Sequence, residues 1–139
     1  MSDWDAARFL PSVARPTSWY LRFGLSGHTV PVDGIFVAAH RAMEARDLEP
    51  WERDAVREVL AWFDEHLAAP NPRDSRARFF VRSGSHEMVA RFWELHDLLR
   101  ALGVPVEMVA VRRVGRVVVA DEHQVAAVRE ATRGRAVIR

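Results

Sequence analysis

The segment from residue 50 to residue 67 constrains the fold more than any other part of the chain. On a helical wheel at about 100° per residue, its apolar side chains fill one half and its charged side chains fill the other. Pro50 suits the first position of a helix, and Pro70 and Pro72 predict its end. A helix with one apolar side has to lie on a core. We expect this helix to pack on the sheet through Trp51, Val59, Phe63 and Leu67.

Two elements are predicted ahead of this helix. The stretch from Trp19 to Phe23 alternates large apolar residues with others, which indicates a strand with Trp19, Leu21 and Phe23 facing inward. Asp33 can accept hydrogen bonds from the amides of a following helical turn. We therefore expect Asp33 to cap a helix over residues 34–46.

A strand and a helix are predicted after the prolines. Residues 77–82 are typical of a strand around two adjacent phenylalanines. Ser83 or Ser85 is expected to cap a helix that runs to Leu102. Gly103 should end this helix, because glycine readily takes the left-handed conformation that closes many helices.

The remaining pattern predicts a β-hairpin. Residues 104–111 and 117–120 form its two strands, and residues 112–116 form its turn. Residues 124–128 are either a short edge strand or a helical turn.

These elements give the order β-α-α-β-α-β-β. Helices with one apolar stripe and short strands favour an α+β fold, a two-layer sandwich in which a small sheet carries its helices on one face. We expect a single α+β domain over residues 17–128, preceded by a loosely ordered arm at 1–16 and followed by a basic tail at 129–139.

Composition excludes several kinds of chemistry. The chain of 139 residues suits one domain, it has no cysteine, and all twenty of its basic residues are arginine. Disulfides, thiolate metal sites, cysteine nucleophiles, Schiff-base chemistry and Walker-type phosphate loops are therefore excluded. No apolar run approaches the roughly 18 residues of a membrane span, and the acidic start lacks a secretory core. We expect no membrane partner and a cytoplasmic location.

The six histidines do not show the spacing of metal ligands. We therefore predict no metal and no cofactor. His66 and His96 both fall within apolar helical arcs, which is typical of partly buried histidines. A pair that meets across two helices as a catalytic or pH-sensitive element is the alternative.

The string from Ser83 to His86 is the one candidate for nucleophilic catalysis. It lies where a strand meets a helix, but the order of its residues differs from a nucleophile elbow. A serine cap explains the same residues, and an incidental anion site beside Arg82 stays open. Asp121 and Glu122 are the one candidate carboxylate pair that does not lie on the solvent face of a helix, and a turn-forming Asp121 is favoured over an acid–base pair.

Arginines gather in the second half of the chain. Residues 1–70 carry a net charge of −4 and residues 71–139 a net charge of +5. Such a split is typical either of a basic binding face or of two halves that attract each other. Arginine can bind phosphate with two parallel hydrogen bonds, although ordinary solvated arginines explain the pattern as well. The candidates for nucleic-acid or anion binding are Arg78, Arg82, Arg112, Arg113 and Arg116.

Two tryptophans are candidates for a protein interface. Trp93 lies at the margin of an apolar helical arc, where it either covers the edge of the core or contacts a partner. Trp4 lies in the predicted arm. Tryptophan is the residue type most enriched at binding hot spots.

From Trp19 to about Val128, the chain resembles a family of small, uncharacterised bacterial proteins. The resemblance rests on the strings at residues 62–67 (WFDEHL), 103–106 (GVPV) and 121–126 (DEHQVA). It implies a single cytosolic α+β domain and transfers no catalytic residue. The chain differs from the family at Val114, where proline is expected, and at both termini. The element order also resembles Alba-type folds and the C-terminal fold of initiation factor three, which bind nucleic acid.

Three functions follow as hypotheses. The first is a non-enzymatic binding module that recognises a protein partner or a second copy of itself. The second is a nucleic-acid-binding domain that acts through its arginines. The third is a small-molecule enzyme with a site near Ser83–His86.

Overall fold

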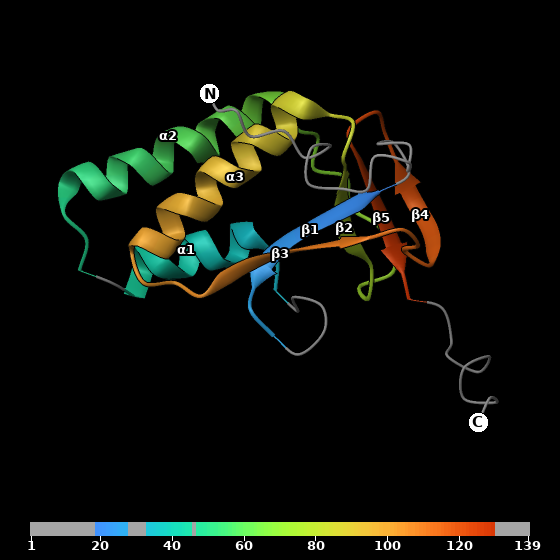
Figure 1. The fold of residues 1–139 in the computed structure, drawn as a ribbon, viewed down its shortest axis with the longest axis horizontal. Coiled ribbons are helices and arrows are strands. Elements are labelled where there is room, and N and C mark those ends of the chain that lie inside the picture. The colour runs from blue at the N-terminus through green and yellow to red at the C-terminus, as the bar shows by residue number, and fades with distance from the viewer. Residues whose placement is uncertain (1–18, 28–32, 46, 130–139) are drawn as a thin grey trace.

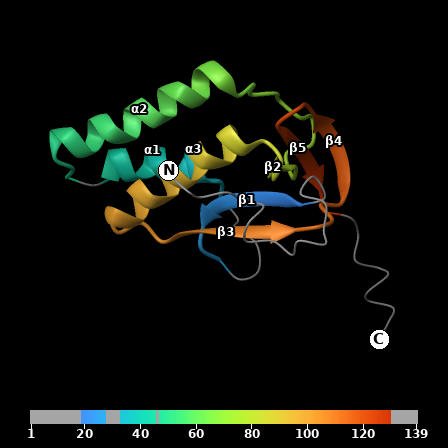
Figure 2. The ribbon, with the colours of Figure 1, turned by 45° about the horizontal axis from the view of Figure 1, so that its top comes forward.

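The computed structural model describes residues 19–27, 33–45 and 47–129. In these residues, the helices lie together on one side of an antiparallel sheet, which confirms the predicted α+β class (Figures 1 and 2). The predicted arm, with Trp4, and all but the first residue of the predicted tail lie outside the described residues. The elements are β1 (Tyr20–Leu25), α1 (Ile35–Ala45), α2 (Pro50–His66), β2 (Arg78–Arg82), α3 (His86–Ala101), β3 (Val106–Val111), β4 (Arg116–Ala120) and β5 (Gln124–Val128).

The sheet has the strand order β3-β1-β2-β5-β4. The predicted hairpin of β3 with β4 is therefore wrong, because these two strands form opposite edges of the sheet. β5 is the reason. The sequence predicts either an edge strand or a helical turn for this segment. In the structure it is a strand that pairs with β2 on one side and with β4 on the other.

The sheet is curled. Every neighbouring pair of strands is antiparallel, so β3 and β4 run in the same direction. Their link from Val111 to Arg116 spans about 18 Å at full extension. In a flat sheet the edge strands alone would lie about 19 Å apart, and the link would also have to cross the length of the sheet. Figure 1 shows the solution: β1 and β3 run across the view, and β4 and β5 run steeply beside them.

The main core lies between the helices and the first strands. Leu21 and Phe23 of β1 are buried in it, as predicted. Phe63 of α2 is buried too, and its ring lies 5.0 Å from that of Phe36 in α1 and 4.6 Å from that of Phe92 in α3. α2 thus packs mainly on the other two helices, and the prediction that it packs on the sheet is wrong.

Trp51 is a correction to the predicted core. It is 68% exposed, although the helical wheel of α2 places it on the apolar side. The wheel shows which side of a helix faces the core, but not how far the neighbouring helices reach along it. Trp51 lies in the first turn of α2, whereas Phe63 contacts both neighbouring helices near the other end.

A second group of buried apolar residues lies on β2 and β5, outside the main core cluster. All five residues of β5 are buried, so both faces of this strand are covered. A strand covered on both faces shows no alternation of apolar and polar residues, which explains why its sequence was ambiguous. The group consists of Phe80, Val125, Ala126, Ala127 and Val128.

Two further observations concern the helices. Gly103 has a φ of 89° directly after α3, which confirms its predicted role at the helix end. Across the part of the chain that the structure describes, no helix is both long and apolar enough to cross a bilayer.

Candidate functional sites

Regular strand pairing stops early on one side of β1. On the other side, all six residues of β1 pair with β3. With β2, only Tyr20 and Leu21 find partners, which are Arg82 and Val81. Further along, Gly24 pairs instead with Gly34, just ahead of α1. The sheet therefore has a gap between β1 and β2, beginning at Arg22.

A cavity of about 720 Å³ occupies this gap and extends beneath the helices. This volume falls in the range of small-molecule sites, about 300–1,000 Å³. All three helices contribute to its walls, as do β1, β2 and the segment that joins α2 to β2. Its aromatic lining consists of Phe23, Phe36, Phe63, Phe79, Phe80 and Phe92.

Arg22 is the buried cation of this cavity. It is only 6% exposed, and its Nη1 donates a hydrogen bond of 3.1 Å to the carbonyl oxygen of Phe79 across the gap. Its guanidinium also lies 6.0 Å from the centre of the Phe80 ring. Burial and the positive charge of Arg78 lower the pKa of Arg22 to about 10, and Asp33 opposes this shift. Arg22 therefore remains charged at neutral pH.

The rim of the cavity carries charges that are partly paired. Arg76 binds Asp74 through two hydrogen bonds, of 3.0 and 2.8 Å. These bonds hold the pKa of the Asp74 carboxyl at about 2. Asp33 forms an ion pair with Arg41, in which Asp33 Oδ2 lies 2.8 Å from Arg41 Nη1. Arg22 and Arg78 line the cavity together with the acidic residues Asp33 and Asp64.

This site does not follow from the sequence. The alternating pattern of the strand places Arg22 outward, and no pattern marks the phenylalanines as a cavity lining. The early end of pairing between β1 and β2 is a tertiary feature with no local pattern. The available signal was a charged residue within a stretch of large apolar ones, Trp19 to Phe23.

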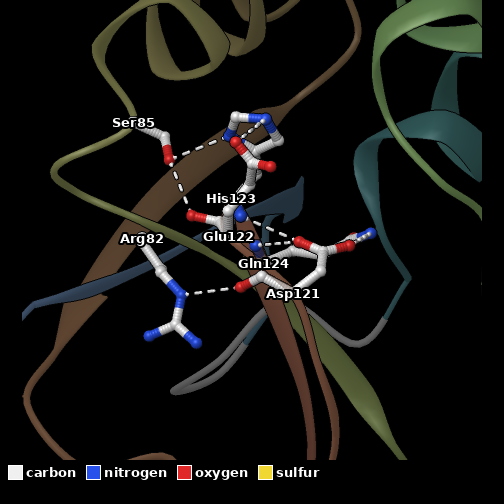
Figure 3. A network of polar contacts seen from close by, with 6 residues as sticks. All are labelled: Arg82, Ser85, Asp121, Glu122, His123 and Gln124. Carbon is white, nitrogen blue, oxygen red and sulfur yellow. Dashed lines mark hydrogen bonds and ion pairs between the residues drawn. The ribbon is translucent and has the colours of Figure 1, made fainter.

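Asp121 organises a second polar site, in the turn between β4 and β5 (Figure 3). Its Oδ1 accepts hydrogen bonds from the backbone amides of His123 and Gln124, at 2.8 and 2.9 Å. The Gln124 side chain donates to Asp121 Oδ2 and to the carbonyl of Ala68. Burial raises the pKa of Asp121, but the hydrogen bonds outweigh it, and the pKa lies below its usual value. Asp121 is the turn-forming residue that the sequence favours.

This turn places His123 against Ser85. The Oγ of Ser85 lies 3.1 Å from Nδ1 of His123 and 3.3 Å from the carbonyl oxygen of Glu122. The Glu122 carboxylate lies 3.5 Å from Nε2 of the same ring. Ser85 holds the N-cap position of α3, as predicted, but its side chain makes no capping hydrogen bond. The other cap candidate, Ser83, is fully buried, and its Oγ has no hydrogen-bond partner among the described residues.

Four of the predicted basic residues fall into two groups, one at each end of β2. Arg82 pairs with Tyr20, and Arg112 directly follows Val111, which pairs with Tyr20 from the other side. Arg78 and Arg116 lie at the opposite end of β2, on either side of β5. The two ends of β2 are about 13 Å apart.

Individual contacts of these arginines also differ. The guanidinium of Arg112 lies 4.8 Å from the centre of the Trp19 ring, and Arg82 donates from Nε to the carbonyl oxygen of Asp121. Arg113 and Arg116 are exposed.

Trp93 covers the edge of the core. It is half-buried, and its ring lies 5.1 Å from that of Phe23 and 4.7 Å from that of His96. His66 lies in different surroundings, because it is exposed and stacks on Trp62. The two histidines in apolar arcs therefore have separate neighbours.

No group of three or more metal-binding side chains is found in residues 19–27, 33–45 and 47–129. Comparison with known proteins adds no relative: no family model, no curated protein and no solved structure matches the chain. The resemblance to a bacterial family stays a prediction, and function has to be argued from the sites.

Proposed function

We propose that this protein is a binding module whose ligand is a small, largely apolar molecule held in the cavity between β1 and β2. The observation that carries the proposal is the cavity of about 720 Å³ at the point where strand pairing stops. Burial of apolar ligand surface against the aromatic walls would supply most of the binding free energy.

This proposal keeps the non-enzymatic class that the sequence favours but changes the kind of ligand. A protein partner or a second copy of the chain is still a hypothesis. Its predicted anchor, Trp93, already packs against Phe23 and His96. Trp51, which the sequence placed in the core, is the large aromatic residue that α2 leaves exposed.

The test uses naphthylacetamide, a neutral aromatic probe that fits the proposed ligand class, with calorimetry as the readout. Gly34 lines the cavity, and a Cβ added there meets no atom of the described residues within 4 Å. Gly34→Leu should fill part of the space and abolish binding. Ala61→Leu adds the same kind of bulk at an exposed position of α2 and should bind as the wild type does. Absence of binding to the wild type, or equal binding to both variants, would contradict the proposal.

A second candidate function follows from the contact of Ser85 with His123. In an acyl transfer, Ser85 Oγ would form a bond to the acyl carbon of an ester while His123 Nδ1 took its proton. His123 would return the proton to the leaving alkoxide, and water would then hydrolyse the acyl-serine. The test is hydrolysis of nitrophenyl acetate. Ser85→Ala and His123→Gln should both lose the activity, and Ser83→Ala should keep it; equal rates in all three would exclude this function.

A further inference from the structure

We infer that the ligand of the β1–β2 cavity carries an N–H or O–H group that donates a hydrogen bond to the side-chain oxygen of Gln124. This inference rests on the proposed function, because it names the polar group that a largely apolar ligand carries at that site. Three observations support it: the burial of Gln124, the contacts that fix the orientation of its amide, and the acceptor that these contacts leave over.

Gln124 is a buried polar residue of the cavity lining. It is 5% exposed, and it lies at the start of β5 opposite Val81, which is buried as well. Other polar residues of the same lining, Asp64, Ser75 and Arg76, are exposed. Water can satisfy an exposed polar group, whereas a buried one needs a partner inside the protein or on a ligand.

Two hydrogen bonds fix the orientation of the Gln124 amide. Its Nε2 donates to the carbonyl oxygen of Ala68 at 2.8 Å and to Oδ2 of Asp121 at 3.1 Å, the second being part of the network in Figure 3. A carbonyl oxygen and an ionised carboxylate can only accept, so the opposite orientation would place the amide oxygen against two acceptors. Nε2 therefore faces these two groups, and both of its N–H donors are used.

The side-chain oxygen of Gln124 is the acceptor that remains. No group in the part of the chain that the structure describes donates a hydrogen bond to Oε1. Unlike Ser83 Oγ, Oε1 is not sealed off from its surroundings. Because Gln124 is buried and lines the cavity, a donor for Oε1 has to come from a molecule inside the cavity.

This acceptor selects against a ligand that is apolar throughout. Such a ligand would cover Oε1 without giving it a hydrogen bond, and the lost hydration would cost affinity. A ligand with one donor for Oε1 and an apolar body against the phenylalanines matches both parts of the lining. Aromatic or aliphatic amides, alcohols and phenols have this combination.

The test compares naphthylacetamide with naphthylacetone, in which a methyl group replaces the amide NH2. The two probes have nearly the same shape and the same carbonyl group, but only the amide can donate. Without a hydrogen bond to the protein, the ketone should bind more tightly, because its transfer out of water costs less. We expect the opposite: calorimetry of the wild type should show about five- to tenfold tighter binding of the amide.

Two variants locate the acceptor. Gln124→Met keeps the length of the side chain but removes its oxygen, and it should bind the ketone at least as tightly as the amide. Asp64→Leu is the matched control, because it removes an exposed acceptor of the same lining, and it should keep the preference for the amide. An unchanged preference in Gln124→Met, or its loss in Asp64→Leu, would contradict the inference.

NMR provides a second readout in the wild type. The chain has one glutamine and one asparagine, Gln124 and Asn71, so only two side-chain amides have to be distinguished. Naphthylacetamide should shift the Cδ signal of Gln124 more than naphthylacetone does, and the exposed Asn71 should respond to neither probe. The naphthyl ring is common to both probes, so the difference reports the hydrogen bond. Equal shifts at Gln124 would contradict the inference.

Each outcome separates this inference from the proposed function. Binding of the ketone as tightly as the amide by the wild type would contradict the donor but leave the cavity as a binding site. Failure of both probes to bind would contradict the proposed function itself. If Gln124→Met does not fold, the ratio of the two affinities in the wild type and the NMR shifts still decide the inference.

Discussion

Strand β1 has two sides that differ sharply. Towards β3 it pairs along all six of its residues, whereas towards β2 it pairs at only two. On the second side a buried arginine side chain, instead of the backbone ladder, connects the strands. The difference shows how a small sheet can hold a cavity: the fully paired side fixes β1 in place, and the separated side leaves room that the helices cover.

The largest expected effect concerns the covering of the separated side. Phe63→Ala should lower the free energy of unfolding by about 3–5 kcal/mol, because the ring is buried between Phe36 and Phe92. Trp51→Ala, on the same helix, should change it by less than about 0.5 kcal/mol, because Trp51 is 68% exposed. Urea unfolding measures both. A loss below about 1 kcal/mol for Phe63→Ala would mean that α2 does not belong to the core.

A second pair of variants contrasts a crowded link with an open gap. Gly115 has a φ of 96°, and a Cβ at this position would overlap the carbonyl oxygen of Val128. Gly115→Ala should therefore lower stability by about 1–3 kcal/mol. The added Cβ in Gly34→Ala meets no atom within 4 Å in the part of the chain that the structure describes. This variant should leave stability unchanged or raise it by up to about 1 kcal/mol. Similar thermal unfolding of the two variants would contradict the contrast.

A smaller effect is expected at the β4–β5 turn. The pKa of Asp121 is lowered in the folded protein, so its ionised form stabilises the fold. This contribution is complete above the unfolded-state pKa of about 3.9 and is lost as the pH falls through the lower folded-state value. Asp121→Asn should cost about 0.5–1.5 kcal/mol at neutral pH and less at about pH 3, below the usual pKa of an aspartate. Urea unfolding at the two pH values tests this, and a cost independent of pH would contradict it.

The smallest expected effect concerns three basic residues between the end of β3 and the start of β4. Arg112, Arg113 and Arg116 together changed to alanine should leave nucleic-acid binding undetectable, as in the wild type, at physiological salt. Nineteen acidic residues nearly balance the twenty arginines, and four of the predicted basic residues lie in two groups. Fluorescence polarisation with mixed DNA and RNA at two salt concentrations measures this. Sub-micromolar binding by the wild type, with a salt slope that falls by about three units in the variant, would favour the nucleic-acid hypothesis instead.

The sequence predicts elements better than it predicts their neighbours. The helices and the inward residues Leu21 and Phe23 follow from local periodicity, and Gly103 ends its helix for a local steric reason. The pairing of β3 and β4 does not follow, because a short link between two strands is typical of a hairpin. Here β5 occupies the place beside β4, and no local signal shows that it does.

The candidate sites depend even more on tertiary structure. Ser85 is recognisable from the sequence as a residue at a helix start, but its contact with His123 joins positions 38 residues apart. The contact of Arg22 with Phe79 joins positions 57 residues apart. Only the placement of β2 between β1 and β5 brings these residues together.

A crystal structure of the protein with naphthylacetamide tests the central claim most directly. We expect the naphthyl ring among the phenylalanines of the cavity. The strands β1 and β2 should stay separated beyond Leu21. A structure in which pairing of β1 with β2 continues through Arg22 and Phe23, with the probe absent or bound elsewhere, would contradict the claim.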